Sequence, residues 1–472
     1  MIRTALAVIA GKATRAATRR RGGGSALPGL VVERLDPTFL RRALGSLPRG
    51  IVVVSGTNGK TTTTKLLTAV LRAHGLTVFT NPTGSNFTRG VISAMLGEVG
   101  ADGRLVADIA VLELDEAHSL YFARAVTPTY ALLLNVARDQ LDRFAEIDHT
   151  ADLLGRLAEM TSTGFVLNRD DSYISRIARR AGARAHPPGR GVNGAAEGQA
   201  GSPAGPTIRY FGVHPDVADR LRELKEADLR DDDDAPTPPL GEADGLLRTM
   251  DERRFEIVCA DGLGVGPLEL RQRGLAAMIN ATAAVTTARL LLGGDFDPAA
   301  TARALEASAP PFGRGEVVDA GGQPLELVLV KNPAGFTVAL GTYGATPVAT
   351  MIAINDDYAD GTDVSWLYDV AFDALAARGV AITSGVRAYD MALRLAYDDL
   401  STGAVEPDLA AALEAFLAAH PDEPKRIFCT YTAMLTLRKI LAARYGLAAM
   451  GEDPSAHQGP AARTSLGPGG GS

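Results

Sequence analysis

Residues 51–64 read IVVVSGTNGKTTTT, and this stretch decides the fold of the chain. Its first four residues are β-branched and predict a buried parallel strand. Gly56 and Gly59 then allow the backbone to turn tightly and to approach a ligand closely. A helical pattern begins directly after Lys60 and Thr61. This order of strand, glycine loop, Lys-Thr and helix is typical of a loop that binds nucleotide phosphates with backbone N–H groups.

Two side chains of this loop have a predicted chemical role. Lys60 is placed to reach the outer phosphates, and the Thr61 hydroxyl can bind Mg²⁺. The simpler alternative is a glycine turn before a surface helix, but motif and flanking elements agree with each other. The general phosphate-loop pattern has a glycine where this chain has Val54.

Composition narrows the class of protein. A chain of 472 residues predicts two or three domains, and 46% hydrophobic with 22% charged residues is ordinary for a globular protein. The net charge of -7 argues against nucleic acid as the main partner. Cys259 and Cys429 give neither a metal-ligand spacing nor a disulfide framework, which fits a reducing cytoplasm.

The first 48 residues are predicted to form a basic helix and a joint. Arginines and a lysine follow the short apolar run 6–10 closely, so the run does not have the form of a signal peptide. A basic amphipathic helix and a glycine-rich joint at 22–25 fit better. No stretch has the length of a membrane span, and contact of the helix with a membrane surface stays open.

Strands and helices alternate after the phosphate loop. Strands are predicted at 77–80, 108–114, 130–135 and 165–168, which favours a doubly wound parallel sheet with ligands at the carboxyl ends of its strands. Polar residues follow those ends: Asn81, Thr83, Glu113, Asp115, Glu116, Asn135, Arg138, Asp139, Asn168, Asp170 and Asp171. Glu113 can bind the same Mg²⁺ as Thr61; the alternative is that 113–116 cap the next helix. Arg138 is predicted either to face a phosphate or to form a surface ion pair.

The rest of the chain is predicted to divide into three parts. The span 49–312 is predicted as an ATPase domain, with an insertion at 186–250 in which the aspartate run 231–234 is a solvated linker. Within it a hairpin covers 254–270, and helices cover 275–292 and 298–308. A joint at 310–315 leads to a smaller α/β domain, 313–450, with strands at 325–330, 348–354, 380–383 and 426–429. A disordered tail is predicted at 451–472.

Four segments together resemble the MurT family, the synthetase subunits of lipid II isoglutaminyl synthase. They are SGTNGKTT at 55–62, RDQLDRF at 138–144, KNPAG at 331–335 and NDDYADGTDVSW at 355–366. The first is shared by Mur ligases and folylpolyglutamate synthases, and the last two are more specific to MurT. The resemblance runs from the basic helix to about residue 445.

The resemblance implies an activity and a partner. MurT proteins use ATP to activate the α-carboxylate of D-glutamate in the lipid II stem peptide as an acyl phosphate. Ammonia from a glutaminase subunit, GatD, then gives D-isoglutamine for peptidoglycan synthesis. The resemblance thus implies ATP and Mg²⁺ as cofactors, lipid II at the inner membrane surface as substrate, a GatD-type subunit as partner and a cytoplasmic location.

The resemblance also implies roles for residues. Phosphate-binding residues are Gly56, Thr57, Asn58, Gly59, Lys60, Thr61 and Thr62, with Lys60 also catalytic. Thr61 and Glu113 serve Mg²⁺, and Asn280 and Arg314 contact the nucleotide. Asp363 completes a Cys-His pair of the partner as a triad. The chain departs from the family at Ala277, where the family has asparagine. It also lacks the cysteines of a zinc ribbon at 186–245, so no zinc is predicted.

The acidic loop can also be interpreted from its residues alone. Asp356, Asp357, Asp360 and Asp363 are close in sequence, so each raises the pKa of the others unless cations or metal compensate. An acidic turn in which Asp363 caps a helix containing Trp366 is the simpler interpretation, and the twelve-residue match favours the partner role.

Two other functions remain open from the sequence. The same ATPase motif serves Mur-type and folylpolyglutamate-type ligases that add an amino acid instead of ammonia. A regulator that binds nucleotide without catalysis is a third possibility.

Overall fold

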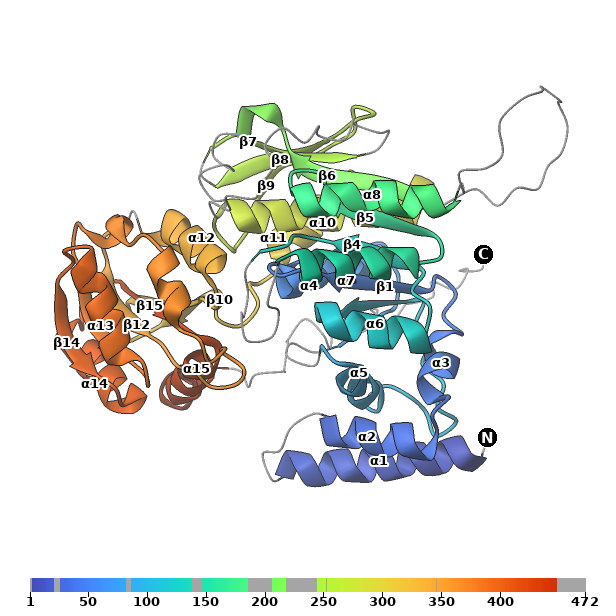
Figure 1. Ribbon diagram of the computed structural model, residues 1–472, viewed down its shortest axis with the longest axis horizontal. Coiled ribbons are helices and arrows are strands. Elements are labelled where there is room, and N and C mark those ends of the chain that lie inside the picture. Colours follow the sequence, from blue (N-terminus) through green and yellow to red (C-terminus); the bar gives the residue numbers. More distant parts are fainter. Residues whose placement is uncertain are drawn as a thin grey trace, which may run out of the picture.

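The computed structural model describes residues 2–20, 26–81, 86–137, 147–185, 206–217, 244–251, 253–344 and 346–447 (Figure 1). Several predicted features lie outside these residues: Thr83, the segment 138–144, the aspartate run 231–234 and the tail 451–472.

The first sheet has nine strands in the order β2-β3-β1-β4-β5-β6-β7-β8-β9. The strands from β2 across to β7 are parallel, and β8 and β9 add an antiparallel hairpin at one edge. Their bounds are β1 Ile51–Ser55, β2 Val78–Thr80, β3 Ile109–Glu113, β4 Tyr130–Leu133, β5 Gly164–Asn168, β6 Thr207–Val213, β7 Gly245–Thr249, β8 Arg254–Cys259 and β9 Gly264–Glu269.

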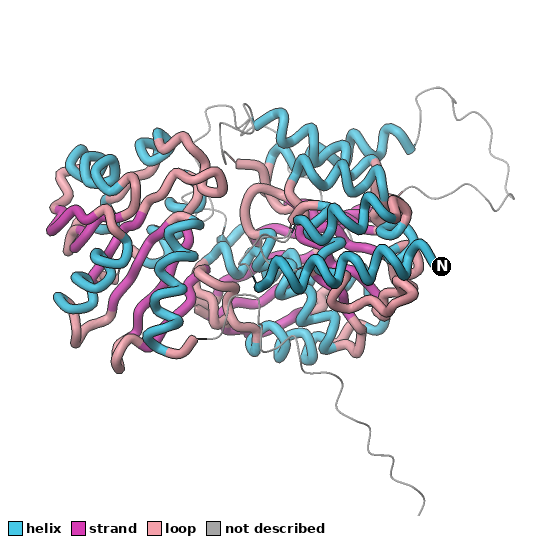
Figure 2. Tube along the Cα trace, turned by 90° about the horizontal axis from the view of Figure 1, so that it is seen from below, coloured by secondary structure: helices cyan, strands magenta, loops and turns pink. Residues whose placement is uncertain are grey.

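Helices cover both faces of this sheet, as the doubly wound prediction requires (Figures 1 and 2). Side chains of β1 alternate: Val53 packs into the core on one face, and Val52 and Val54 pack into the core on the other. One face carries α5 (Thr88–Met95), α6 (Glu116–Ala125), α7 (Ile147–Glu159) and α8 (Ser172–Ala185), and the other carries α4 (Lys60–Ala73), α10 (Leu275–Leu292) and α11 (Pro298–Ala307).

The segment expected to be an insertion, 186–250, contains two strands of this sheet. Strand β6 pairs with β5 and β7 pairs with β6, both parallel. Both strands are difficult to recognise in the sequence because Pro, Gly and Asp residues surround them. β7 itself has only the five residues Gly-Leu-Leu-Arg-Thr, which are too few for a clear alternation.

The N-terminal residues have no core of their own. They form α1 (Ile2–Arg20), α2 (Ala26–Leu35) and α3 (Phe39–Leu44). Ala7, Val8 and Val32 belong to the same hydrophobic cluster as Val53 of β1. Asp36 accepts hydrogen bonds from Thr4 Oγ1 at 3.0 Å and Arg42 Nη2 at 2.7 Å, which ties α1 to α3. The three helices are therefore an extension of the first sheet's domain.

The second sheet has six strands in the order β10-β11-β15-β12-β13-β14. Only β10 is antiparallel to its neighbour. The strands are β10 Arg314–Asp319, β11 Pro324–Leu329, β12 Ala349–Ala353, β13 Val380–Ser384, β14 Thr402–Glu406 and β15 Lys425–Cys429, and the helices are α12 Pro333–Tyr343, α13 Ala388–Tyr397, α14 Leu409–Ala419 and α15 Tyr431–Tyr445. The sequence did not predict β10, which begins inside the expected joint, or the edge strand β14, which has no buried residue.

Among the described residues, one helical stretch is long and apolar enough to cross a membrane by length and composition alone. It is Leu275–Asp295, which contains α10, and 72% of its most apolar part is buried. Because α10 packs on β5, β6 and β7 of the first sheet and beside α4, it is a core helix of this domain.

The packing of α2 on α5 gives a stability test. A Cβ on Gly29 would lie 2.0 Å from the carbonyl oxygen of Arg89, so Gly29→Ala must push the two helices apart. We expect it to lower the free energy of unfolding by about 1–3 kcal/mol, the usual cost of overpacking. Gly294→Ala is the matched control, because nothing lies within 4 Å of its Cβ position. Urea unfolding followed by circular dichroism measures both variants, and equal midpoints for the two would contradict this packing.

Candidate functional site: a phosphate loop covered by the second domain

The phosphate loop turns at two glycines with positive φ. Gly56 has φ 129° and Gly59, directly before α4, has φ 87°. Asn135, which follows the neighbouring strand β4, holds the turn from the side. Its Oδ1 accepts from the backbone N–H of Asn58 at 2.8 Å, and its Nδ2 donates to the Asn58 carbonyl at 3.0 Å. The loop is thus fixed by a residue from the adjacent strand end, as the parallel sheet predicts.

Lys60 folds back over the loop that precedes it. Its Nζ donates to the carbonyl oxygens of Gly56 at 2.5 Å and Thr57 at 3.3 Å, and to Glu116 Oε1 at 3.1 Å. The side chains of Lys60 and Glu116 are only 10% and 3% exposed. The ammonium group is therefore held at the mouth of the loop by one carboxylate and two carbonyls.

Asp115 adds a second carboxylate near this lysine. Burial raises the pKa of Asp115, but a hydrogen bond from His118 and the charge of Lys60 lower it by more, so its pKa lies below the ordinary value. Asp115 is consequently ionised at neutral pH, and the region around Lys60 is acidic.

Thr61 and Glu113 lie side by side. Thr61 Oγ1 donates to Glu113 Oε1 at 2.9 Å. The Glu113 backbone is fixed by Asn81, which accepts from its N–H and donates to its carbonyl, both at 2.9 Å. No group of three His, Cys, Asp or Glu residues that could hold a metal occurs in the described part of the chain. One hydroxyl and one carboxylate nevertheless fit Mg²⁺, which takes few protein ligands and completes its shell with water and phosphate oxygens.

Asn280 reaches the loop from α10. A Cβ on Gly59 would lie 2.4 Å from Asn280 Oδ1, so the loop and this amide are in direct contact. Ala277 is buried about one turn earlier on α10.

The second domain touches the loop at two points. Arg314, the first residue of β10, donates from Nη2 to Thr61 Oγ1 at 3.4 Å. Burial lowers the pKa of Arg314, although the charge of Glu113 opposes this. Asn332 donates from Nδ2 to Asn58 Oδ1 at 3.2 Å, and its own Oδ1 accepts from Gly335 N–H and caps α12.

Asn332 is the contact that sequence reasoning did not assign. The sequence did indicate that Asn332 caps a helix, because an asparagine before Pro333 is typical of a helix N-cap. No sequence pattern, however, indicates that this cap faces Asn58 of another domain.

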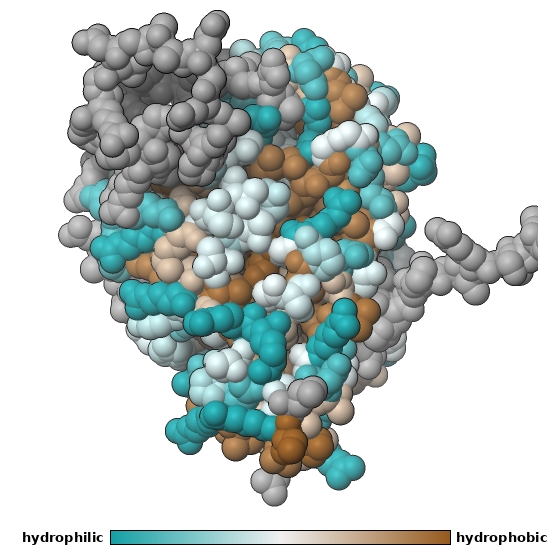
Figure 3. All heavy atoms as spheres, turned by 90° about the vertical axis from the view of Figure 1, so that its right-hand side faces the viewer, coloured by the Kyte–Doolittle hydropathy of each residue, from teal (hydrophilic) through white to brown (hydrophobic). Residues whose placement is uncertain are grey.

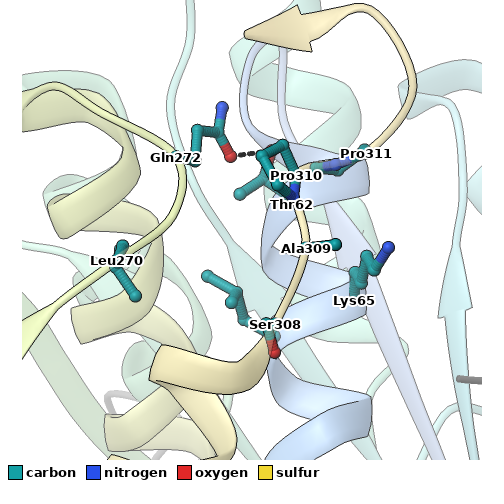
Figure 4. Close-up of a pocket in the computed structure, with 9 residues that line it drawn as sticks. Thr62, Lys65, Leu270, Gln272, Ser308, Ala309, Pro310 and Pro311 are labelled. Carbon is teal, nitrogen blue, oxygen red and sulfur yellow. Dashed lines mark hydrogen bonds between the residues drawn. The ribbon is translucent and has the colours of Figure 1, made fainter. Parts of the chain in front are cut away.

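A small, open cleft lies beside the first turns of α4 (Figure 4). Thr62 and Lys65 line one side, and Thr62 Oγ1 lies 3.5 Å from Gln272 Oε1 across it. Leu270 and the segment 308–311 close the other sides, so the cleft lies where the chain passes from α11 toward the second domain. Of the predicted phosphate-binding residues, Thr62 is the one that lines it.

Asp356, Asp360 and Asp363 of the acidic loop each have a partner of their own. Asp356 pairs with Arg387 Nη2 at 2.6 Å. Asp360 accepts from the N–H of Thr432 at 2.8 Å and from its hydroxyl, and burial raises its pKa with a smaller contribution from Asp357. Arg387 and Thr432 thus compensate part of the charge of this loop, while Asp357 still raises the pKa of Asp360, in line with the expectation from the sequence.

Asp363 lies apart from the phosphate loop's contacts, at the surface of the second domain. Its Oδ1 accepts from the N–H of Ser365 at 2.9 Å, and this bonding lowers its pKa. Ser365 opens the short 3₁₀ helix Ser365–Asp369, in which Trp366 is buried. Asp363 thus supports this turn and still presents an ionised, exposed carboxylate.

Neither cysteine has the surroundings of a reactive thiol. Cys259 and Cys429 are buried, and burial raises the pKa of both. Thiolates carry the nucleophilic chemistry of cysteine, so neither thiol is activated here.

Comparison with known proteins identifies the family. Family models match the Mur ligase middle domain at 54–190 and the MurT ligase C-terminal domain at 329–434. The MurT subunit of lipid II isoglutaminyl synthase from Streptococcus pneumoniae is 30% identical over 473 residues, which cover 94% of this chain and 98% of that protein. This chain belongs to the MurT family. A MurT subunit from Staphylococcus aureus is 28% identical over 83% of this chain and 86% of that protein.

Solved structures show the same fold at lower identity. MurF from Acinetobacter baumannii superposes with a TM-score of 0.62 and 18% identity, over 89% of this chain and 80% of that one. Folylpolyglutamate synthase from Mycobacterium tuberculosis gives 0.58 and 15%, over 88% and 98%. The predicted Mur-ligase-type α/β fold of this MurT protein, with a second, smaller α/β domain, is confirmed.

The contact between Gly59 and Asn280 generates a binding test. Gly59→Ala places a methyl group against the Asn280 amide at a backbone conformation that alanine rarely adopts. We expect the affinity for ATP to fall roughly tenfold or more, equivalent to about 1.4 kcal/mol. Isothermal titration calorimetry measures the change.

Gly75→Ala is the matched control for this test. Gly75 has φ 82°, nearly that of Gly59, but nothing lies within 4 Å of its Cβ position. The control should lose some stability and keep its ATP affinity. Wild-type affinity in folded Gly59→Ala would show that the loop does not hold the nucleotide in this geometry.

Proposed function

We propose that this chain is the synthetase subunit that amidates the α-carboxylate of D-glutamate in the lipid II stem peptide to D-isoglutamine. ATP phosphorylates the carboxylate, and ammonia from a GatD-type glutamine amidotransferase displaces the phosphate. The supporting observation is the phosphate loop that is contacted by Arg314 and Asn332 of the MurT-type C-terminal domain, in a chain that matches MurT subunits over nearly its whole length.

The loop residues would bind and orient the triphosphate. Backbone N–H groups at the start of α4 face it, and the side chains of Lys60 and Arg314 bring two positive charges to the same place. Thr61 and Glu113 would hold Mg²⁺, which neutralises charge on the phosphates when bound. Attack by the substrate carboxylate breaks the bond to the terminal phosphoryl group and releases ADP; attack by ammonia then releases phosphate.

Asn280 is placed to contact the nucleotide next to the loop. Because Gly59 and Asn280 touch, any group bound over the loop also lies near this amide.

The surface near Asp363 supports a partner subunit. Exposed apolar side chains gather on α13 and on the 3₁₀ helix that follows Asp363, and the rings of Tyr368 and Tyr397 lie 5.9 Å apart. Tyrosines are enriched in protein–protein interfaces. The exposed residues of this surface are Tyr358, Tyr368, Val386, Tyr389, Leu393 and Tyr397. A glutaminase docked there would find Asp363 ionised and exposed, able to orient a histidine of its Cys-His pair.

This subunit would work at the cytoplasmic side of the membrane, where its lipid-linked substrate is made. Two buried cysteines without a disulfide suit that compartment.

Two variants separate the glutaminase role of Asp363 from the synthetase role of Lys60. Asp363→Asn keeps size but removes the charge, so we expect glutamine-driven amidation to fall about a thousandfold or more, as in triads that lose their aspartate. Amidation supplied with free ammonia should survive in Asp363→Asn. Lys60→Ala should lose both reactions by roughly 100-fold, because each needs phosphoryl transfer.

The measurement is amidated lipid II formed by the reconstituted complex, with glutamine or with ammonium chloride as nitrogen source. Equal loss of both reactions in Asp363→Asn would place Asp363 in the synthetase chemistry. Turnover of a free amino acid in place of ammonia would favour the amino-acid-adding alternative instead.

The absence of structural zinc stays a prediction. It depends on the missing cysteine quartet at 186–245. Elemental analysis of protein purified without added zinc should find far less than one equivalent. One equivalent retained through dialysis against a chelator would contradict it.

A further inference from the structure

Helix α1 carries a row of exposed apolar side chains on its outer face. Ile2, Leu6 and Ile9 are 81%, 60% and 59% exposed and follow one another at helical spacing. The exposed alanines Ala13 and Ala16 continue the row. We call these five residues the α1 stripe.

The stripe is not needed to hold α1 in the fold. A different face of the helix, with Thr4, Ala7, Val8 and Gly11, is buried against the rest of the domain. A Cβ on Gly11 would lie 2.5 Å from Val32 Cγ2 of α2, so that face is tightly packed. Single exposed apolar residues are normal, whereas an aligned row of them marks a binding surface.

The segment that carries the stripe is rich in basic residues. Residues 1–49 contain ten Lys and Arg against two Asp and Glu, a net charge of +8 in a chain whose total is -7, although Arg42 pairs with Asp36 and Arg49 with Asp295. Arg20 and Arg34 are exposed. Arg3 is exposed too, and its Nε donates to the carbonyl of Leu35 at 2.6 Å, which brings the half-exposed Leu35 next to the first turn of α1.

The position of α1 leaves this face accessible. In Figures 1 and 2, α1 lies in an outer layer of the molecule, with α2 beside it. Figure 3 shows hydrophobic and hydrophilic side chains alternating at the lower end of the molecule, where α1 and α2 lie in Figure 1.

We propose that α1 docks on an anionic phospholipid bilayer, with the α1 stripe in the interface between headgroups and acyl chains. Apolar side chains flanked by cations are the features that hold an amphipathic helix in the plane of such a surface. A second copy of this chain fits less well, because two segments of net charge +8 would repel each other. This proposal does not depend on the proposed reaction, so either one can fail alone.

The experiment is co-flotation of the full chain with lipid vesicles that contain no substrate. Vesicles of phosphatidylglycerol mixed with phosphatidylcholine should carry the protein up the gradient, and vesicles of phosphatidylcholine alone should carry far less. Leu6→Gln with Ile9→Gln should weaken binding at least about tenfold, because both side chains leave the acyl boundary. Arg20→Gln with Arg34→Gln should weaken it several-fold, and added salt should do the same.

The matched control is Val386→Gln with Leu393→Gln, an equally exposed apolar pair, 66% and 54%, in the second domain. It should leave flotation unchanged, and circular dichroism should confirm that every variant is folded. Equal flotation of the wild type with both kinds of vesicle, or of the Leu6/Ile9 variant and the wild type, would overturn the proposal. A dimer in solution that the Leu6/Ile9 change dissociates, without any loss of flotation, would identify the stripe as a contact between two copies instead.

Discussion

The tight turn at the end of β1 is the constraint on which the rest of the site depends. Gly56 and Gly59 adopt backbone conformations that other residues rarely adopt, and a side chain at Gly59 would collide with Asn280. The turn brings the start of α4 to the sheet edge where the neighbouring parallel strands also end. Glu113 at the end of β3 and Asn135 after β4 reach the loop for that reason. A helix N-terminus, a carboxylate and an amide are thus assembled by topology.

A network of ion pairs connects the second domain to the first. Glu326 of β11 pairs with Arg426 of β15, Nη2 to Oε2 at 2.8 Å, and both side chains are nearly inaccessible. The same carboxylate also pairs with Arg273, which precedes α10 in the first domain. Ion pairs of this kind give little net stability, but removal of one partner leaves an uncompensated buried charge. The contact therefore fixes the position from which Arg314 and Asn332 reach the loop.

The sequence predicted those helices and strands that are determined by interactions between residues close together in the chain. The helix at 275–292 and the hairpin at 254–270 before it could be predicted because their periodicity or turn residues are local. The strands β6 and β14 were missed, since one is surrounded by Pro and Gly and the other lies exposed at an edge. Asn332 could not be assigned to the site, because its contact with Asn58 depends on how two domains sit against each other.

Lys60 is held in the loop by an anion of the chain itself. A buried ammonium without a partner would be costly, and Glu116 removes that cost by pairing with it at 3.1 Å. The two loop carbonyls that also accept from Lys60 fix its position. A phosphate bound at the loop would compete with Glu116 for the same ammonium, so part of its attraction to Lys60 would only replace the existing ion pair. The position of the ammonium is thus fixed by the chain, and this preorganisation is gained at the expense of phosphate affinity.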